Sequence, residues 1–275
     1  MQVPTQAPRR PARWHQLSGL LKAPPDGASQ ALVERSLGRA LAPVRLLGPG
    51  HPLRELAGAR AFLTLLDAVS THLRGAEREL HLGRLGACLS ETQVGPRSAL
   101  SRSLIAALGP RGFELDWLAA ALNARRNETH RATFLTRREL AEHALDLSGR
   151  LPLALARAGG VDTERSRLQG RALAQAAALA RELRRLLAAW DRGCLFLAVE
   201  DLARHSIAPT VLAERPPPIE LRPLVLEHIS WLRGLLAKAR GLGQGTSYPV
   251  RITLAGTAIR AETNLRRIEL LGLRR

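Results

Sequence analysis

The sequence is poor in aromatic and strand-forming residues. Phe, Trp and Tyr together make up 3% of the 275 residues, and Val and Ile are thinly spread. Leu, Ala and Arg dominate instead, and these residues lose little conformational freedom on entering a helix. The composition therefore predicts an all-α protein.

Cysteines and long apolar runs are scarce as well. Cys88 and Cys194 are too few and too far apart for a disulfide framework or a zinc site. No run approaches the roughly 18 consecutive apolar residues of a membrane-spanning helix. We therefore predict a protein of a reducing compartment, cytoplasmic and able to lie at the surface of a membrane.

The first 28 residues differ from the rest of the chain. They carry Arg9, Arg10 and Arg13 with no acidic residue before Asp26, and they contain five prolines. The prolines disfavour the amphipathic helix of an organelle import signal, although the basic charge leaves import open as an alternative. We predict a flexible basic leader at residues 1–28 and one helical domain at residues 29–275.

Positive charge is in large excess. The formal net charge is +17, and only Lys22 and Lys238 among the 41 basic residues are lysines, so the others are arginines spread along the chain. Such a surface attracts a phosphorylated ligand, an acidic membrane face or a nucleic acid. Nucleic acid is the least favoured of the three, because the chain has few aromatics to stack on bases and no recognised nucleic-acid-binding motif.

Glycines and prolines divide the chain into helical runs. Thr136 and Glu139 match a capping box, and Asp162 or Thr163 is placed to cap the longest helix. Pro152 predicts a bend in the helix that begins at Thr136. The runs lie at residues 29–47, 53–73, 80–89, 98–108, 114–126, 136–144, 163–190, 223–240 and 250–271.

Four segments carry a family likeness. They are residues 61–71 (AFLTLLDAVST), 123–129 (NARRNET), 139–149 (ELAEHALDLSG) and 178–202, which ends in RGCLFLAVEDL. In this order and at these separations they resemble the squalene/phytoene synthases. The resemblance implies a single-domain bundle of the isoprenoid-synthase type around a central cavity.

The metal-binding motifs of that family are degenerate here. Of the Asp-Asp-x-x-Asp pattern only Asp67 remains, with Ala68 and Thr71 at the other two positions. The family has a second helix that carries two metal-binding aspartates, and this chain has Arg185 and Ala189 at those two positions. On the same helix, Arg181 stands where the family has an asparagine. In residues 139–149, His143 stands where the family has a tyrosine. Glu128 is the nearest match to the acidic residue that the family has before residues 139–149.

The family resemblance implies two carboxylate clusters that bind magnesium and so help a diphosphate to leave. Magnesium needs several oxygen ligands, which a lone Asp67 facing arginines cannot provide. We therefore expect no metal site and no cofactor. Asp67 is a weak candidate for a catalytic residue, and a structural partner of an arginine is the alternative.

The arginines have two interpretations. Arg125, Arg126, Arg181 and Arg185 could grip a phosphate or diphosphate directly through charge-assisted hydrogen bonds. Alternatively, they lie on solvated helix faces or pair with nearby acids such as Glu128, Glu182 and Asp191. His143 could likewise line a cavity or act as an acid or base, or simply be packed. A bound apolar tail would run along Phe62, Leu66, Leu147, Leu179 and Leu183.

The leading functional hypothesis is a non-catalytic or metal-independent family member. It would bind a prenyl diphosphate, an isoprenoid or another anionic lipid, or help a protein partner to assemble a membrane complex, as the squalene-synthase-like assembly factors of respiratory complex I do. The alternative is an active prenyl transferase that condenses prenyl diphosphates, and only that alternative requires Mg²⁺.

Overall fold

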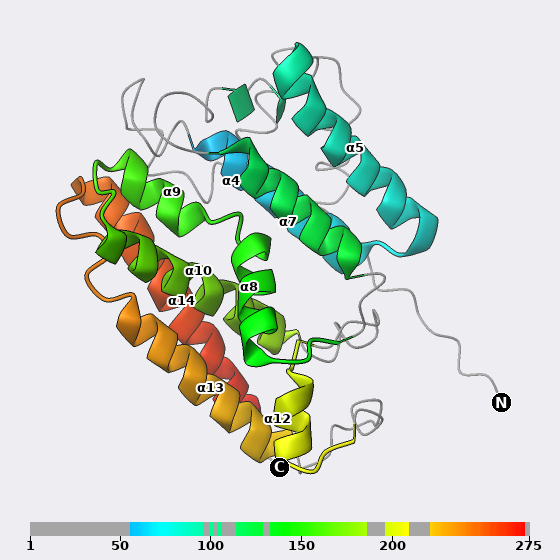
Figure 1. Cartoon of the computed structure of the whole chain (residues 1–275), viewed down its shortest axis with the longest axis vertical. Helices are drawn as coiled ribbons and strands as arrows, with labels where there is room; N and C mark the ends of the chain where they lie inside the picture. Colours follow the sequence, from blue (N-terminus) through cyan, green and yellow to red (C-terminus); the bar gives the residue numbers. More distant parts are fainter. Residues whose placement is uncertain are drawn as a thin grey trace. The chain divides into compact units, whose positions relative to one another are not determined.

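The computed structural model describes residues 56–95, 100–101, 104–105, 114–128, 133–185, 196–208 and 221–272. These residues form nine α-helices and no strand, which confirms the predicted fold class (Figure 1). The chain divides into two compact units, residues 1–109 and 110–275, and each is described by itself. The leader and the helix predicted at 29–47 lie outside the described residues, and a single helical domain over 29–275 stays a prediction.

Two helices joined by two residues make up most of the described part of the first unit. Helix α4 spans Ala57–His72 and helix α5 spans Gly75–Val94. Along α4, Phe62, Leu66 and Val69 are buried at helical spacing. Helix α5 has 20 residues and is twice as long as the run predicted at 80–89. Residues 100–101 and 104–105, within the run predicted at 98–108, are helical.

The second unit is organised around its alanine-rich helix α10, which spans Glu164–Arg184. It contacts helices α8, α9, α13 and α14, and α13 and α14 run alongside it in Figure 1. Small side chains allow this close packing: a Cβ atom on Gly170 would lie 2.9 Å from Leu153 Cγ of α9. The other helices are α7 (Leu115–Asn127), α8 (Arg137–Leu147), α9 (Leu151–Ala158), α12 (Val199–Arg204), α13 (Leu221–Lys238) and α14 (Tyr248–Gly272).

Both predicted caps begin helices where expected. The Thr136 hydroxyl accepts a hydrogen bond from the Glu139 amide at 3.2 Å, and the Glu139 carboxylate accepts one from the amide of Leu135 at 2.9 Å. The second cap is a complete capping box between Thr163 and Ser166. Helix α10 ends at Arg184, and residues 186–190 of its predicted extension lie outside the described residues.

The bend predicted at Pro152 is wrong, because the helix stops before the proline. Helix α8 ends at Leu147, and Gly149 and Arg150 then adopt left-handed backbone angles with φ of 54° and 52°. Pro152 lies in the first turn of the new helix α9, where it sacrifices no intrahelical hydrogen bond. The small pair Ser148–Gly149 thus marks a helix break.

A short extended contact ties the segment before α12 to the start of α8. Phe134 and Ala198 form a parallel bridge, in which the Val199 amide donates to the Phe134 carbonyl at 2.8 Å. The Glu200 carboxylate then accepts from the Arg137 amide at 2.8 Å, at the first turn of α8. Residues 198–200, near the end of the fourth family-like segment, therefore brace the start of helix α8.

Candidate functional site

Arg181 and Arg185 lie one helical turn apart at the carboxyl end of α10. Cations are favoured there because the last carbonyls of a helix carry partial negative charge. The Arg181 side chain is 31% exposed, and its Nε donates to Glu182 Oε1 at 3.2 Å. Arg185 is the residue that follows the last turn and is partly buried. Ala189, the other predicted motif position on this helix, lies outside the described residues.

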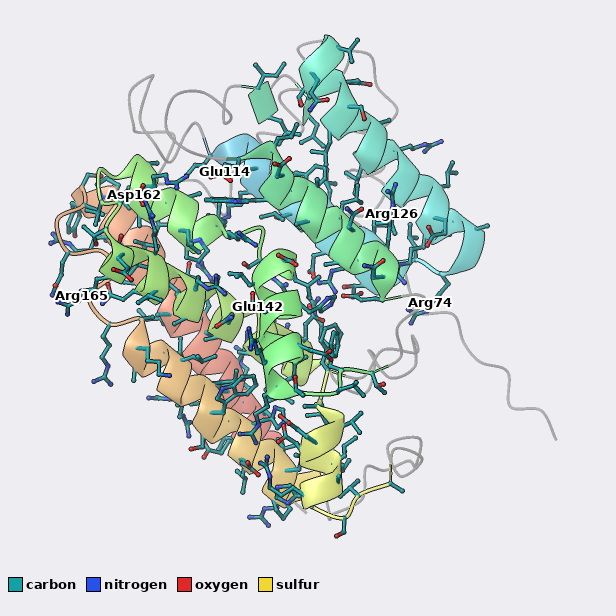
Figure 2. The ribbon with its side chains drawn as sticks, in the orientation of Figure 1. Arg74, Glu114, Arg126, Glu142, Asp162 and Arg165 are labelled. Atoms are coloured by element: carbon teal, nitrogen blue, oxygen red, sulfur yellow. The ribbon has the colours of Figure 1, made fainter. Side chains whose placement is uncertain are left out.

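A buried ion triplet lies beside them. Arg125 of α7 donates from Nη1 to Glu128 Oε1 at 2.7 Å and from Nη2 to Glu182 Oε1 at 2.8 Å. All three side chains are at most 3% exposed. Arg125 is therefore paired with Glu128 and Glu182, which is the second of the two interpretations of the arginines given above. Arg126, the next residue along α7, is partly buried (Figure 2).

His143 of α8 packs against the same cluster. Its ring lies 4.7 Å from the Phe134 ring and 5.9 Å from the Phe196 ring, measured between centroids. Its Nε2 is 3.4 Å from Glu128 Oε1, although no hydrogen bond joins the two. The aromatic contacts and the nearby carboxylate hold the imidazole in place at the edge of the buried core.

The residues at the family's metal positions do not fit magnesium. Arg181 and Arg185 carry positive charge, and Glu128 and Glu182, the acids near them, are bound to the guanidinium of Arg125. A magnesium ion would have to displace that guanidinium from a buried position to gain oxygen ligands. Within the described residues, no three His, Cys, Asp or Glu side chains gather as a metal site would require.

The predicted apolar lining is divided between the two units. Phe62 and Leu66 are buried in the first unit, where Asp67 is half-buried on α4. Leu147, Leu179 and Leu183 are buried in the core of the second. The central cavity, and the facing arrangement of Asp67 and Arg185, stay predictions for this chain.

Sequence reasoning missed a second polar network, formed by α8, α12 and α13. Asp201 is fully buried. Its Oδ2 accepts a hydrogen bond from Arg137 Nε at 2.8 Å and lies 2.9 Å from His228 Nε2. Glu227 pairs with Arg137 and lies 2.6 Å from His205 Nε2. The one feature of the sequence that pointed to this network was Asp201, which lies in the fourth family-like segment, residues 178–202.

The network lowers the pKa of both carboxylates. Burial alone would raise the pKa of Asp201, but its hydrogen bonds with His228 and Arg137 outweigh burial and lower the pKa to about 2. The pKa of Glu227 is also lowered to about 2, chiefly by its hydrogen bonds with His205 and Arg137. Both groups are therefore ionised in the folded protein at neutral pH.

These shifts predict acid sensitivity of the second unit. Because both folded-state pKa values lie below the ordinary values of 3.8 and 4.5, the stabilisation is complete above about pH 5 and is lost as the pH falls toward 2. Asp201 alone should account for about 2 kcal/mol. Urea unfolding of wild type and Asp201→Asn at pH 7, 5, 4 and 3 measures this, and parallel curves for the two proteins would contradict it.

Many exposed arginines of the second unit are paired with acids on neighbouring elements. Figure 2 labels three of these acids, Glu114, Glu142 and Asp162. Glu114 lies 3.0 Å from Arg157, and Glu142 lies 2.8 Å from Arg171. Exposed pairs of this kind add little stability, so much of the arginine excess on these helices is a solvated surface.

Comparisons with known proteins agree with this fold. The chain matches the squalene/phytoene synthase family over residues 24–272, and it therefore belongs to that family. It superposes on a squalene synthase, HpnC from Alicyclobacillus acidocaldarius, with a TM-score of 0.72 at 17% identity, covering 94% of this chain and 96% of that one. A dehydrosqualene synthase in complex with ligand gives a TM-score of 0.69 at 18% identity, covering 88% and 87%. No curated protein sequence matches this chain.

Proposed function

We propose that this protein is a metal-independent, non-catalytic member of the squalene/phytoene synthase family that binds an isoprenoid or another anionic lipid. Such a protein would deliver or retain the lipid, or use it in the assembly of a membrane complex with a protein partner. Ionisation of a diphosphate by magnesium is not part of the proposed role.

One observation carries this proposal. At the carboxyl end of α10, Arg181 and Arg185 replace an expected asparagine and an expected aspartate, and Arg125 holds Glu128 and Glu182 in a buried ion triplet. A guanidinium placed between two carboxylates offsets part of their charge, but unlike a metal ion it has no open coordination site for a diphosphate. The protein thus has an internal cation fixed next to the α10 arginines.

Arg181 and Arg185 are the residues proposed to contact the anionic group of the ligand. They are four residues apart at the carboxyl end of α10, Arg181 in its last turn and Arg185 directly after it, and Arg181 is accessible to solvent. The proposal gives Arg125 an internal role instead. Hydrogen bonds to charged groups contribute roughly 1.5–3 kcal/mol each, so two guanidinium groups could replace a metal bridge.

Binding of farnesyl diphosphate in EDTA tests the proposal. Wild type should bind without metal, and Arg185→Ala should bind about tenfold more weakly or worse, because one charge-assisted contact is lost. Arg185→Asp should bind more weakly still, since a single carboxylate repels the diphosphate. Arg184→Ala is the matched control, because Arg184 is an exposed arginine of the same turn and should leave binding unchanged.

Two results would contradict the proposal. Equal binding by wild type and Arg185→Ala, or binding by neither, would mean that the arginines do not form an anion site. Formation of a condensed prenyl product that depends on magnesium and on Asp67 would establish the catalytic alternative. Mass spectrometry of lipids that co-purify with the protein would identify the natural ligand without assuming a reaction.

A further inference from the structure

Helix α14 carries apolar side chains on two opposite faces. Its inner face contacts α9, α10 and α13 and buries Val250, Leu254, Ala261 and Leu265. Its outer face exposes a second apolar stripe, whose members are 4, 7 and 11 residues apart and therefore share one side of the helix. Four of the nine large apolar side chains that are exposed in the described part of the chain lie on this stripe: Tyr248 (67% exposed), Ile252 (48%), Ile259 (65%) and Leu270 (58%).

The stripe includes one polar hydroxyl, whose hydrogen bond is made within its own helix. The Thr263 hydroxyl, which lies between Ile259 and Leu270 on the stripe, donates to the carbonyl of Ile259 at 2.8 Å. The stripe extends over about 33 Å, at 1.5 Å per residue from Tyr248 to Leu270, and between Ile259 and Leu270 it also carries the exposed side chain of Arg266, which pairs with Glu262 at 3.3 Å.

Positive charge flanks the stripe, and negative charge is drawn away from it. The two acids of α14, Glu262 and Glu269, lie 3.2 Å and 2.8 Å from Arg233 Nη2 of helix α13. Arg251, Arg260 and Arg267 are exposed on α14, and within the described residues no ion pair joins them to an acid. This differs from Arg157 and Arg171, which are paired.

We propose that the outer face of α14 lies on an anionic phospholipid surface. The apolar stripe would enter the boundary between headgroups and acyl chains, and the flanking arginines would reach the phosphates on either side, since their long stems can cover apolar surface while the charge stays in water. None of the described helices is long and apolar enough to cross a membrane. A helix lying in the plane of the surface is the arrangement that this pattern fits.

This inference does not depend on ligand binding at the α10 arginines, and its test is separate. The full chain is sedimented with vesicles of phosphatidylcholine alone or mixed with phosphatidylglycerol. Because residues 1–28 are themselves basic, the α14 variants decide the matter, not wild-type binding alone. Wild type should bind the mixed vesicles at low salt and bind less at high salt.

Two double variants remove the two parts of the surface. Ile252→Ser with Ile259→Ser should reduce partitioning by about tenfold or more, because the inserted apolar area is lost. Arg260→Glu with Arg267→Glu should reduce it at least as much on anionic vesicles. Leu168→Ser is the matched control, since Leu168 is an equally exposed leucine, 63% accessible, at the start of α10. Circular dichroism establishes that each variant is folded.

Three outcomes would overturn the proposal. One is equal binding of wild type to neutral and anionic vesicles, and another is unchanged binding by the Ile252→Ser, Ile259→Ser variant. The third is a dimer, seen by light scattering and dissociated by the same variant, since the stripe would then be covered by a second copy of the chain. Loss of binding in both α14 variants with full binding by Leu168→Ser supports the proposal.

Discussion

Arg125→Ala is expected to lower the free energy of unfolding by about 3–5 kcal/mol, the cost of removing one partner from a buried ion pair. The substitution leaves Glu128 and Glu182, each at most 3% exposed, without the guanidinium that now lies between them. The loss should be larger at pH 7 than at pH 5, because two buried carboxylates of like charge favour protonation. Urea unfolding at both pH values measures the effect.

Two further variants show whether the buried charge is the cause. Adding Glu128→Gln and Glu182→Gln to Arg125→Ala should recover part of the lost stability, because amides cost less to bury than carboxylates. Arg171→Ala removes an exposed arginine, paired with Glu142 at 2.8 Å, and should cost about 0.5 kcal/mol or less. A change of under about 1 kcal/mol for Arg125→Ala would contradict the role assigned to the triplet.

Asp201→Ala should lower the free energy of unfolding by about 3 kcal/mol at pH 7, because it removes a buried carboxylate that accepts from two elements at once. Arg137 of α8 and His228 of α13 would lose their shared partner, and His228 is itself buried. Thermal unfolding at pH 7 and pH 3 measures the change, which should shrink at the lower pH.

Asp146→Ala is the control for this substitution. Asp146 is a half-exposed carboxylate of α8 that lies 3.4 Å from Arg150, so its removal should cost little. A similar loss of stability for the two aspartates would show that burial at position 201 is not what matters. Unchanged stability of Asp201→Ala would mean that the network around Asp201 does not stabilise the fold.

Helices were predictable from the sequence wherever a local signal marks their ends. Thr136 and Thr163 begin helices as expected, because a hydroxyl placed before a helical run satisfies free amides of the first turn. The break between α8 and α9 was missed, because Pro152 can either bend a helix or begin one. The left-handed backbone of Gly149 and Arg150 decides between these, and the sequence pattern does not reveal it.

The candidate site was only partly predictable. The positions of Arg181 and Arg185 follow from the register of the family motif, so the charge inversion could be recognised in the sequence. The bond from Arg125 to Glu182 joins residues 57 apart, and periodicity shows which face of a helix is buried but not which helix covers it. In an arginine-rich chain each guanidinium has several possible partners, and only the packed structure selects one.

The brace between the start of α8 and α12 bears on the order in which the second unit folds. Arg137 and Asp201 are separated by 64 residues, and the intervening chain contains α8, α9 and α10. Closing a loop of that length costs more entropy than forming the local contacts within it, so the brace is expected to close after these helices have formed. Weakening it should then leave the folding rate almost unchanged and speed unfolding, which makes Asp201 a determinant of how long the native state persists.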